Sequence, residues 1–577
     1  MAILNKLLSN HYVQLFLLLL FPLLALLRPG LPLTHDGQDH VARIANFYQS
    51  LSDGNIIPRW AGNLNWGYGH PVLMFLYPLP SYVASIFHII GINLVDSTKL
   101  VFGLSFIASG LFMYLFVAKA WGKMTGFIAA LLYNFAPYRF VDLYIRGAIG
   151  EHVAFIWPPL ICFFLFKLSG INISNVNSHP QRIMYQVSSI KQKKSIIFHG
   201  LGLALSVVFL ILSHNALAIM FLAVIFLYFL YLLFIKKKQK FWFLITSFTS
   251  LMIGFILSCF YWFPAVFEGK YTLRDIVTQG EFADRFSSFY SFIYSPWNYG
   301  GSAEFSKQIG LVHWIGIILL LYFLVKKKFK FSQTALYIGC LAVLVLTLFL
   351  MTPISTFVWN SVSILQKFQF PWRFLSVTVF VSAFLAASGF FHAIQIITDR
   401  YQLKEKYTIF VLSFLILALT YTMWQPKGYL IKPESFYTYV YNGTTDTGES
   451  SPIWSVRFME RRPAVPAFVA QGHAAIRLLQ KTTTERDYEI KSESKTRIVE
   501  NTLYFPGWRV YVDGYPVSVE FQDPTYRGLI TYWLESGSHV VNLRFTDTKI
   551  RRLADDVSLT GLVVLFIIGM YVWRLKT

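Results

Sequence analysis

Charged residues are scarce in this chain. Asp, Glu, Lys and Arg make up 14% of the 577 residues, whereas 55% are hydrophobic and the mean hydropathy is +0.51. A soluble protein of this length has no interior that could hide so much apolar surface, whereas lipid solvates it. The three cysteines, Cys162, Cys259 and Cys340, all lie inside apolar runs. A disulfide framework or a cysteine-based metal site is therefore excluded.

Several motifs are also missing. The sequence holds no HExxH or CxxC pattern, no Walker loop, no Rossmann glycine fingerprint and no GxSxG. ATP hydrolysis by this chain therefore has no support. The formal charge of +21 does not indicate a nucleic-acid partner, because the lysines stand in short clusters between apolar runs rather than along one face of a domain.

Apolar runs long enough to cross roughly 30 Å of hydrocarbon recur along the chain. The first run is interpreted as a retained span, because residues 31–34 offer no small-residue cleavage site. The stretch 72–92 is predicted to lie on the outer membrane surface or to re-enter it. The predicted crossings are 12–28, 97–118, 124–138, 152–169, 197–213, 215–235, 241–263, 309–325, 332–351, 371–396, 408–425 and 556–573.

The basic clusters set the orientation, since Lys and Arg in short loops mark the cytoplasmic side. With 72–92 outside, every cluster and Lys6 fall on the cytoplasmic side, and both termini do too. A full crossing by 72–92 would instead move the 170–196 loop and the later clusters outside. The clusters are Lys119/Lys123, Lys191/Lys193/Lys194, Lys236–Lys238 with Lys240, Lys326–Lys328 with Lys330, Arg400/Lys404/Lys406, and Arg574/Lys576.

The sequence thus predicts a mostly α-helical, polytopic transmembrane bundle in a cell inner or plasma membrane, with a C-terminal extracytoplasmic domain resembling a β-sandwich. The helical domain spans 1–425 with outer loops 29–96, 139–151, 264–308 and 352–370. The β-rich domain spans 426–553, and 554–577 forms the last transmembrane helix and a short tail. Alternating polarity predicts one hairpin from 502–512 and 515–521, and another from 528–534 and 539–545.

The first outer loop carries the densest polar pattern. Asp36 and Asp39 share one face if a helix begins there, beside His40 and Arg43. Carboxylates at a membrane boundary are costly unless solvated, paired or used. Such a carboxylate could take a proton from an acceptor hydroxyl, or the two together could hold Mg²⁺ or Mn²⁺ against a phosphate. The alternative is that Asp36 only caps the helix that follows.

Further candidates lie in the other outer segments. Arg59 and Trp60 open a stretch rich in Gly, Asn and aromatic residues that suits a sugar or a lipid headgroup, or else an ordinary interfacial turn. Arg146 could bind a phosphate through its fork while Glu151 acts as a second acid, or the two could simply pair.

Two more polar residues stand at outer helix ends. His214 lies between two spans, where a histidine is more often a hydrogen-bonded structural residue than a ligand. Arg373 opens another span, where it could snorkel or bind a lipid phosphate.

Several strings resemble a known family when they are taken in order along the chain. The acidic first loop, the surface segment and the outer C-terminal domain are similar to the GT-C class of membrane glycosyltransferases. More narrowly, the chain resembles the bacterial membrane family labelled "6-pyruvoyl-tetrahydropterin synthase-related", although nothing here supplies the histidine triad of a pterin synthase. The strings are Pro58-Arg59-Trp60 with 63–69, Arg146-Gly147-Ala148 with Glu151, Ser213-His214-Asn215, Phe370-Pro371-Trp372-Arg373, and Pro506-Gly507-Trp508 with Val512-Asp513-Gly514.

The GT-C resemblance implies transfer of a sugar from a polyprenyl-phosphate donor, on the outer face, to a lipid, glycan or protein acceptor. In that class an acidic residue of the first outer loop is the base or a metal ligand. By position this is Asp36, with Asp39 as the alternative. On this hypothesis Arg146 and Arg373 neutralise the donor phosphate and Glu151 assists.

Two other functions fit the sequence. A transporter or flippase for a lipid-linked saccharide would need charged residues at bilayer depth and repeat symmetry, neither of which stands out. A non-catalytic envelope assembly protein would use its β domain to bind a polymer or a partner.

Overall fold

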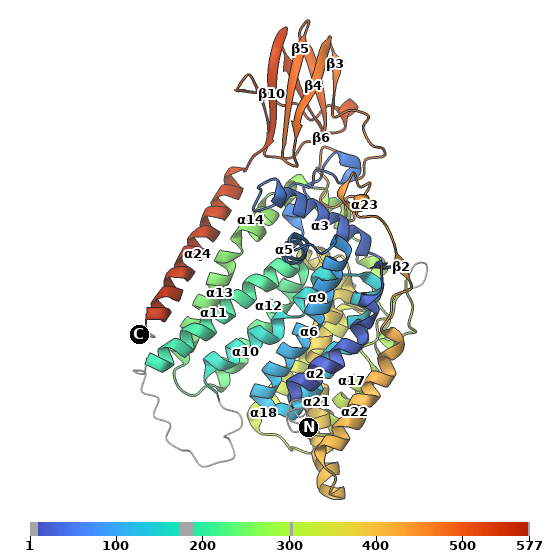
Figure 1. The fold of residues 1–577 in the computed structure, drawn as a ribbon. Helices are drawn as coiled ribbons and strands as arrows, with labels where there is room; N and C mark the ends of the chain where they lie inside the picture. Colours follow the sequence, from blue (N-terminus) through green and yellow to red (C-terminus); the bar gives the residue numbers. More distant parts are fainter. Residues whose placement is uncertain (1–9, 172–189, 301–303, 575–577) are drawn as a thin grey trace.

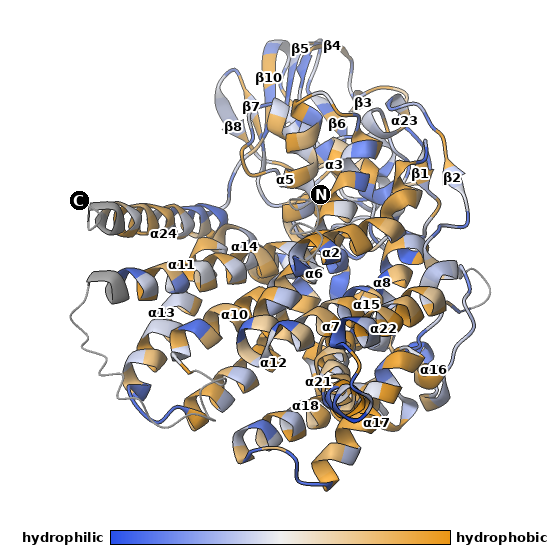
Figure 2. Ribbon diagram, turned by 60° about the horizontal axis from the view of Figure 1, so that its bottom comes forward, coloured by the Kyte–Doolittle hydropathy of each residue, from blue (hydrophilic) through white to orange (hydrophobic). Residues whose placement is uncertain are grey.

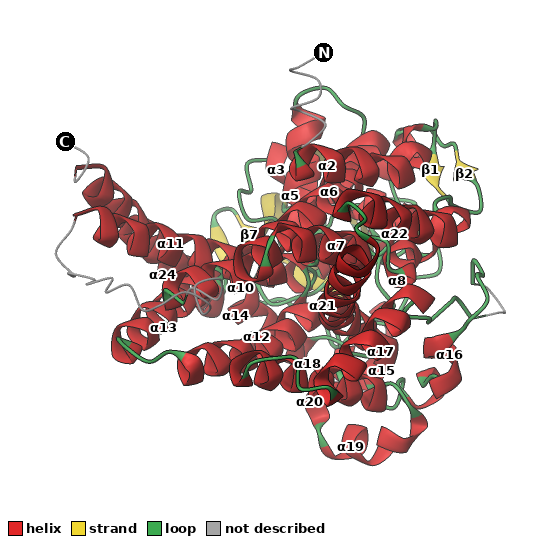
Figure 3. Ribbon diagram, turned by 90° about the horizontal axis from the view of Figure 1, so that it is seen from below, coloured by secondary structure: helices red, strands yellow, loops and turns green. Residues whose placement is uncertain are grey.

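The computed structural model describes residues 10–171, 190–300 and 304–574, and it divides into a helical bundle and a β-sandwich at one end of the bundle (Figure 1). The last strand leads directly into the final helix, which runs from the sandwich down the side of the bundle. Seen from the end away from the sandwich, helices fill the view (Figure 3).

Long apolar helices make up the bundle. Within the described ranges, nine helices are long and apolar enough to cross a membrane. The helices are coloured mostly as hydrophobic in Figure 2. Large apolar side chains on them are exposed, among them Phe226 and Phe234, which are 56% and 65% exposed. Such a surface is stable in lipid and not in water, so the chain is a multi-pass membrane protein. The long helices are α6 (Leu94–Trp121), α10 (Trp157–Ser169, continuing α9, Ile149–Ala154), α11 (Ile190–Ser213), α12 (Asn215–Ile235), α13 (Lys240–Leu257), α18 (Phe331–Leu350), α21 (Leu375–Tyr401), α22 (Glu405–Thr420) and α24 (Lys549–Arg574).

Shorter helices fill the gaps and correct some of the predicted crossings. The predicted crossing 124–138 is wrong, because α7 (Lys123–Asn134) has only 12 residues, about 18 Å, and is buried along most of its length. The predicted crossing 241–263 is interrupted at Ser258, where α13 ends and α14 (Cys259–Phe267) begins. The stretch 72–92 forms α4 (Val72–Phe75) and α5 (Leu79–Ile89), each too short for a span, and its place on the outer membrane surface stays a prediction. The other short helices include α2 (His11–Leu20) with η1 (Phe21–Leu27), α3 (Gly37–Ser52), α8 (Pro137–Phe140), the π-helical turn η3 (Val141–Arg146), α15 (Arg274–Thr278), α17 (Leu311–Val325), η8 (Pro371–Phe374) and α23 (Ser435–Thr438).

Two antiparallel sheets form the C-terminal domain. One has the strand order β4-β5-β10-β7-β8 and the other β3-β6-β9. The first predicted hairpin is confirmed in a shorter form, with β7 and β8 joined by Asp513-Gly514. The second is wrong, because β9 pairs with β6 while β10 pairs with β5 and β7 in the other sheet. The strands are β3 (Ala467–Gln471), β4 (Ala474–Lys481), β5 (Glu485–Ser492), β6 (Thr496–Leu503), β7 (Trp508–Val512), β8 (Tyr515–Val517), β9 (Leu529–Leu534) and β10 (Gly537–Phe545).

Arg59 and Trp60, in the segment between α3 and α4, hold the sandwich against the bundle. The ring of Trp60 is fully buried and packs edge-on against Trp508, with centroids 5.4 Å apart, and beside Phe545. Next to it, Arg59 pairs with Asp547 at 2.8 Å and with Asp555 of α24 at 2.6 Å. These contacts fix the orientation of the sandwich relative to the bundle.

A buried ion pair forms a second joint. Arg551, near the start of α24, is fully buried and donates from Nε to Glu268, next to the end of α14, at 2.8 Å. Its Nη2 donates to the carbonyl of Pro506 in the sandwich at 2.6 Å. One guanidinium therefore ties two helices and the β domain together.

Substituting Arg551 is expected to loosen this joint. Arg551→Ala leaves the buried Glu268 carboxylate without its cationic partner and with only the hydroxyl of Thr548 as a donor, which costs about 3–5 kcal/mol of folding free energy. The neighbouring Arg552 is exposed, so Arg552→Ala is the matched control and is expected to change stability by about 0.5 kcal/mol or less. Thermal unfolding of the purified protein in detergent measures both, and equal stability of the two variants would contradict the proposed joint.

Candidate functional site

Residues 31–37 position the start of α3 against the end of the π-helical turn. Leu31 and Pro32 pair with residues 429–430, after which the amide of Asp36 donates to the carbonyl of Arg146 at 2.8 Å. The turn ends at Gly147, whose φ of +67° is a conformation that favours glycine. A side chain would not fit there either, because a Cβ would lie 2.3 Å from Oγ1 of Thr34. This local fit brings the acidic loop next to the arginine of the second outer segment.

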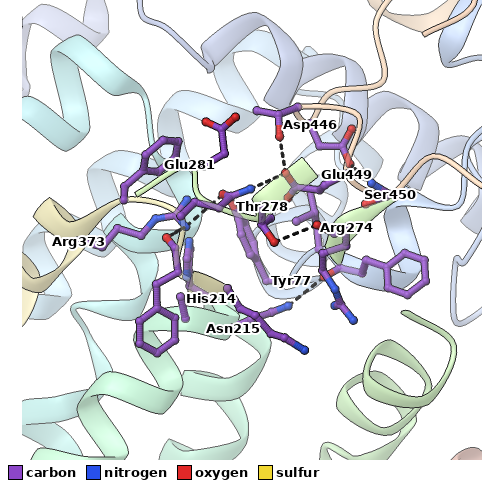
Figure 4. A pocket seen from close by; sticks show the side chains of 18 of the residues that line it. Tyr77, His214, Asn215, Arg274, Thr278, Glu281, Arg373, Asp446, Glu449 and Ser450 are labelled. Carbon is purple, nitrogen blue, oxygen red and sulfur yellow. Dashed lines mark hydrogen bonds between the residues drawn. The ribbon is translucent and has the colours of Figure 1, made fainter. Parts of the chain in front are cut away.

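A cavity of about 1600 Å³ opens at this junction. In Figure 4, the carboxylates of Glu281, Asp446 and Glu449 lie at one edge, His214 and Asn215 lie at the opposite edge, and Tyr77 lies between. The polar residues that line the cavity include Asp36, Asp39, His40, Arg43, Tyr77, Arg146, His214, Asn215, Arg274, Glu281, Lys307, Gln369, Arg373, Asp446 and Glu449.

The carboxylate of Asp36 faces this cavity with no hydrogen bond or ion pair to any described side chain. Asp36 stands at the N-cap position of α3 without capping it, since Oγ1 of Thr34 accepts the Gly37 amide instead, at 3.1 Å. Although the side chain is open to the cavity, surrounding protein raises the pKa of Asp36 above its ordinary value. The charge of Arg146 opposes this shift and that of Asp39 adds to it. Asp36 is thus a free carboxylate of increased basicity.

The two other charged residues of α3, Asp39 and Arg43, have hydrogen-bond partners. Oδ1 of Asp39 accepts from the hydroxyl of Tyr441 at 2.7 Å. Arg43 donates to Oγ1 of Thr445 at 3.2 Å and lies 3.3 Å from Nδ1 of His40. Burial, followed by the charge of Arg43, holds the pKa of His40 well below its usual range, so this imidazole is neutral. These contacts bind α3 to the segment that precedes the sandwich.

Glu151, on α9, organises the second part of the site from behind the cavity wall. It is buried and accepts two hydrogen bonds from Arg146, at 2.7 and 2.9 Å, so the predicted pairing of these two residues is present. It also accepts from the hydroxyl of Tyr138 at 2.9 Å, while Arg146 bonds Asp142 at 2.7 Å. Glu151 therefore acts as a positioning residue, since its oxygens are taken up by these partners.

Arg373 lines the cavity and keeps one donor free among the described residues. Its Nε donates to Glu151 at 3.2 Å and its Nη1 to the carbonyl of Phe368 at 2.8 Å. Nη2 has no partner among the described residues and lies at the cavity. The guanidinium also lies over the ring of Phe370, 4.9 Å from its centroid. An anion in the cavity can therefore be bound by Arg373 without breaking an existing bond.

His214 and Tyr77 form a stacked pair on the cavity wall. Their ring centroids are 5.0 Å apart, at an interplanar angle of 26°. Burial lowers the pKa of His214 to about 3, and its Nδ1 accepts from the amide of Leu217 at 3.3 Å, so the proton is on Nε2. The ring of Tyr77 rests on Gly150, where a Cβ would lie 2.3 Å from it. Burial also raises the pKa of Tyr77, so its hydroxyl is a neutral donor.

The cavity changes character toward the long helices. Its wall there consists of side chains from α11, α12, α13 and α14, with Ile219 and Val266 46% and 61% exposed. The site therefore joins a charged chamber to an apolar wall made by helices of the membrane bundle. The apolar residues of this wall are Ile211, Ala218, Ile219, Leu222, Phe255, Trp262 and Val266.

The structure brings most of the predicted site residues together, but not all. Arg59 and Trp60 do not line the cavity, because they are used in the contacts with α24 and the sandwich. The predicted residues that line it are Asp36, Asp39, His40, Arg43, Arg146, His214 and Arg373, with Glu151 directly behind.

The predicted divalent cation between Asp36 and Asp39 would have few ligands in this structure. Within the parts of the chain that the structure describes, no group of three or more His, Cys, Asp or Glu side chains lies close enough to hold a metal ion. One oxygen of Asp39 is also taken by Tyr441. The metal stays a prediction, and the residues present do not form a prepared site for it.

Several lining residues could not be recognised from sequence. Tyr77 lies in an apolar stretch, and apart from the proline that follows it nothing in the sequence marks it as part of a site. Arg274 and Lys307 lie in the long outer loop without a distinguishing pattern, although both face the cavity and the Nζ of Lys307 lies 5.1 Å from the ring of Trp372. Tyr441 and Glu449 come from the segment before the sandwich, more than 400 residues from Asp36.

Comparisons with known proteins give distant likenesses. No protein-family model matches the sequence. An uncharacterised protein of Lactococcus lactis is 26% identical over 241 residues, which cover 40% of this chain and 35% of that protein. The chain thus accounts for about a third of the length of this curated relative.

Three solved structures align with about three-quarters of the chain at low identity. The mycobacterial arabinofuranosyltransferase AftD is 12% identical over 74% of this chain and 29% of its own, with a TM-score of 0.42. ArnT from Cupriavidus metallidurans is 12% identical over 74% and 67%, with a TM-score of 0.39. The oligosaccharyltransferase of Archaeoglobus fulgidus is 14% identical over 75% and 53%, with a TM-score of 0.40. At such TM-scores, a function for this chain has to be argued from its own residues.

The packing of Tyr77 on Gly150 predicts a steric effect. Gly150→Ala is expected to destabilise the protein by about 1–3 kcal/mol, because the new methyl overlaps the tyrosine ring. In a Tyr77→Ala background the same change should cost less, since the ring is gone. Gly339→Ala on α18, where nothing lies within 4 Å, is the control and should be neutral or slightly stabilising. Additive effects of the two changes in thermal unfolding would contradict this packing.

Proposed function

We propose that this protein is a membrane glycosyltransferase that transfers a sugar from a polyprenyl-phosphate donor to a hydroxyl or amide acceptor. The observation that supports it best is a free carboxylate, that of Asp36, in the same cavity as the free donor of Arg373. In such a transfer the acceptor loses a proton and the donor releases its phosphate. The carboxylate of Asp36 can accept the proton, and the guanidinium of Arg373 can stabilise the phosphate.

The donor would lie along the apolar side of the cavity. A polyprenyl chain is a long hydrocarbon with a charged phosphate at one end, and the cavity has one apolar wall and one charged chamber. Ile219 and Phe255 are on helices of the membrane bundle, so lipid can reach this wall from the bilayer.

The phosphate would be held at the opposite end of that wall. Nη2 of Arg373 and Nε2 of the neutral His214 are donors on the side of the cavity where Glu151 anchors the arginine. Because Arg373 is already fixed by Glu151 and by Phe368, little side-chain entropy is lost when it binds the anion.

The chemical step then balances as follows. The acceptor oxygen or nitrogen attacks the anomeric carbon of the sugar while its proton passes to the carboxylate of Asp36. The bond from this carbon to the phosphate oxygen breaks with its electron pair. The polyprenyl phosphate that leaves gains negative charge, which Arg373 stabilises. The raised pKa of Asp36 makes it a stronger base than an ordinary aspartate.

Asp36→Asn tests the base. Transfer should fall by about 10²- to 10⁴-fold, because the amide accepts no proton. Asp39→Asn is the matched control and should have a smaller effect, since Asp39 is already bonded to Tyr441. The measurement is release of undecaprenyl phosphate from a panel of undecaprenyl-phosphate sugars by the purified protein. Transfer by Asp36→Asn at the wild-type rate would remove Asp36 from the mechanism, and movement of uncleaved donor would point to a transporter.

The pH profile gives a second readout for the same base. Only ionised Asp36 accepts a proton, so the rate should rise with pH through a midpoint above the ordinary aspartate value. This limb should disappear in the residual activity of Asp36→Asn and persist in Asp39→Asn.

Arg373→Met tests the phosphate contact. Loss of a charge-assisted hydrogen bond should weaken binding of undecaprenyl phosphate by about 10- to 100-fold. Arg285, which also lines the cavity but lies 3.6 Å from Glu281 and is about half exposed, is the control, and Arg285→Met should have a small effect. Equal losses in the two variants would show general charge attraction rather than a specific contact.

A further inference from the structure

A second cavity, of about 500 Å³, lies where α3 meets the β-sandwich. Gln49, near the end of α3, lines it, whereas Asp36 lies just before the first turn of the same helix in the large cavity. Gln49 is 13 positions after Asp36, which corresponds to about 20 Å along the helix, so the two cavities are separate sites. The lining residues are Gln49, Gly62, Asn63, Tyr439, Val440, Arg462, Lys481, Thr482 and Thr483.

The charge of this second cavity is positive and uncompensated. Arg462 and Lys481 line it, and no carboxylate does. Neither cation has a hydrogen bond or ion pair within the described ranges of the chain. Burial, the nearby Arg486 and Arg462 itself all lower the pKa of Lys481, with only Glu500 acting against them. Glu500 is bound to Arg486 at 3.1 Å and is therefore already balanced. Two cations that repel each other in a concave site favour an anionic ligand.

The rest of the lining suits a sugar. Nδ2 of Asn63 donates to Oε1 of Gln49 at 2.7 Å, which leaves the carbonyl oxygen of Asn63 and the amide nitrogen of Gln49 free for hydroxyl groups. Thr482 and Thr483 also line the cavity. The ring of Tyr439 is 73% exposed at the same cavity and offers a flat apolar face.

The walls are fixed before any ligand binds. Oδ2 of Asp53 accepts from both the amide and the hydroxyl of Thr483, each at 2.7 Å. The backbone of Gly62 lies so close to Thr483 that a Cβ there would be 3.3 Å from it. Asn55 adds a longer contact to Thr484 at 3.4 Å. The turn between β4 and β5 is thus held against the helix, which reduces the entropy that ligand binding would otherwise cost.

We propose that this second cavity binds an anionic saccharide, with Arg462 and Lys481 holding the acid group and Gln49, Asn63 and Tyr439 holding the sugar. Equilibrium binding there needs no transfer activity, so this site stands apart from the function proposed above.

Binding of defined probes to the full-length protein in detergent tests this site. The probes are trigalacturonate, which carries carboxylates on a sugar chain, neutral maltotriose, and inorganic phosphate. The test variant is Arg462→Gln/Lys481→Gln. The matched control is Lys491→Gln/Arg509→Gln, which removes the same charge from exposed positions of β5 and β7 outside the cavity. Tyr439→Ala tests the sugar contact separately.

Calorimetry or thermophoresis should give saturable trigalacturonate binding that weakens as salt is added. The Arg462/Lys481 variant should bind at least tenfold more weakly, Tyr439→Ala severalfold more weakly, and the control variant as the wild type does. Maltotriose and inorganic phosphate should bind much more weakly than trigalacturonate. The proposal is overturned if trigalacturonate fails to bind, if maltotriose or phosphate binds as well, or if the control variant loses as much affinity as the test variant.

Discussion

The carboxylate of Glu151 is the point on which the arrangement of the site depends. It is buried near the start of a transmembrane helix, where an unpaired charge would be prohibitively costly, and it receives donors from Arg146, Arg373 and Tyr138. Tyr138 and Arg146 come from one segment, and Arg373 lies more than 200 residues further along the chain. Because all of these donors bond to the one buried carboxylate of Glu151, they fix the distance between the segment that holds Tyr138 and Arg146 and η8, which carries Arg373.

The three acids Asp36, Asp39 and Glu151 have different roles, because they differ in how many hydrogen-bond partners they have. Glu151 is saturated by its partners and serves to position arginines, and Asp39 is bonded to Tyr441. Asp36 keeps its carboxylate free, because Thr34 caps the helix in its place. This arrangement leaves the carboxylate of Asp36 and Nη2 of Arg373 without partners among the described residues, and both residues line the same cavity. That cavity extends from charged residues to an apolar wall, which matches a ligand with a charged head and a hydrocarbon tail.

The sequence predicted the membrane bundle well because the length and hydropathy of each run follow directly from the thickness of the bilayer. Short helices such as α7 could not be separated from spans, since both are uniformly apolar. The second predicted hairpin failed because β9 and β10 are joined by a tight turn yet belong to different sheets, which strand alternation alone does not reveal. Seven of the predicted polar residues meet at one cavity, which agrees with the expectation that their segments lie at the same end of the bundle.

Other members of the site depend on tertiary contacts that have no local signal. Tyr77 is placed by a glycine on another helix and by a stacked histidine. Arg59 and Trp60 resemble ligand-binding residues by type, but ion pairs to α24 and packing on Trp508 use them instead. The measurement that tests the central claim most directly is a density map of the protein with undecaprenyl phosphate. The phosphate should lie beside Arg373 and His214, with the chain along the wall formed by α12 to α14; a phosphate bound away from Arg373, or a chain away from that wall, would contradict the account.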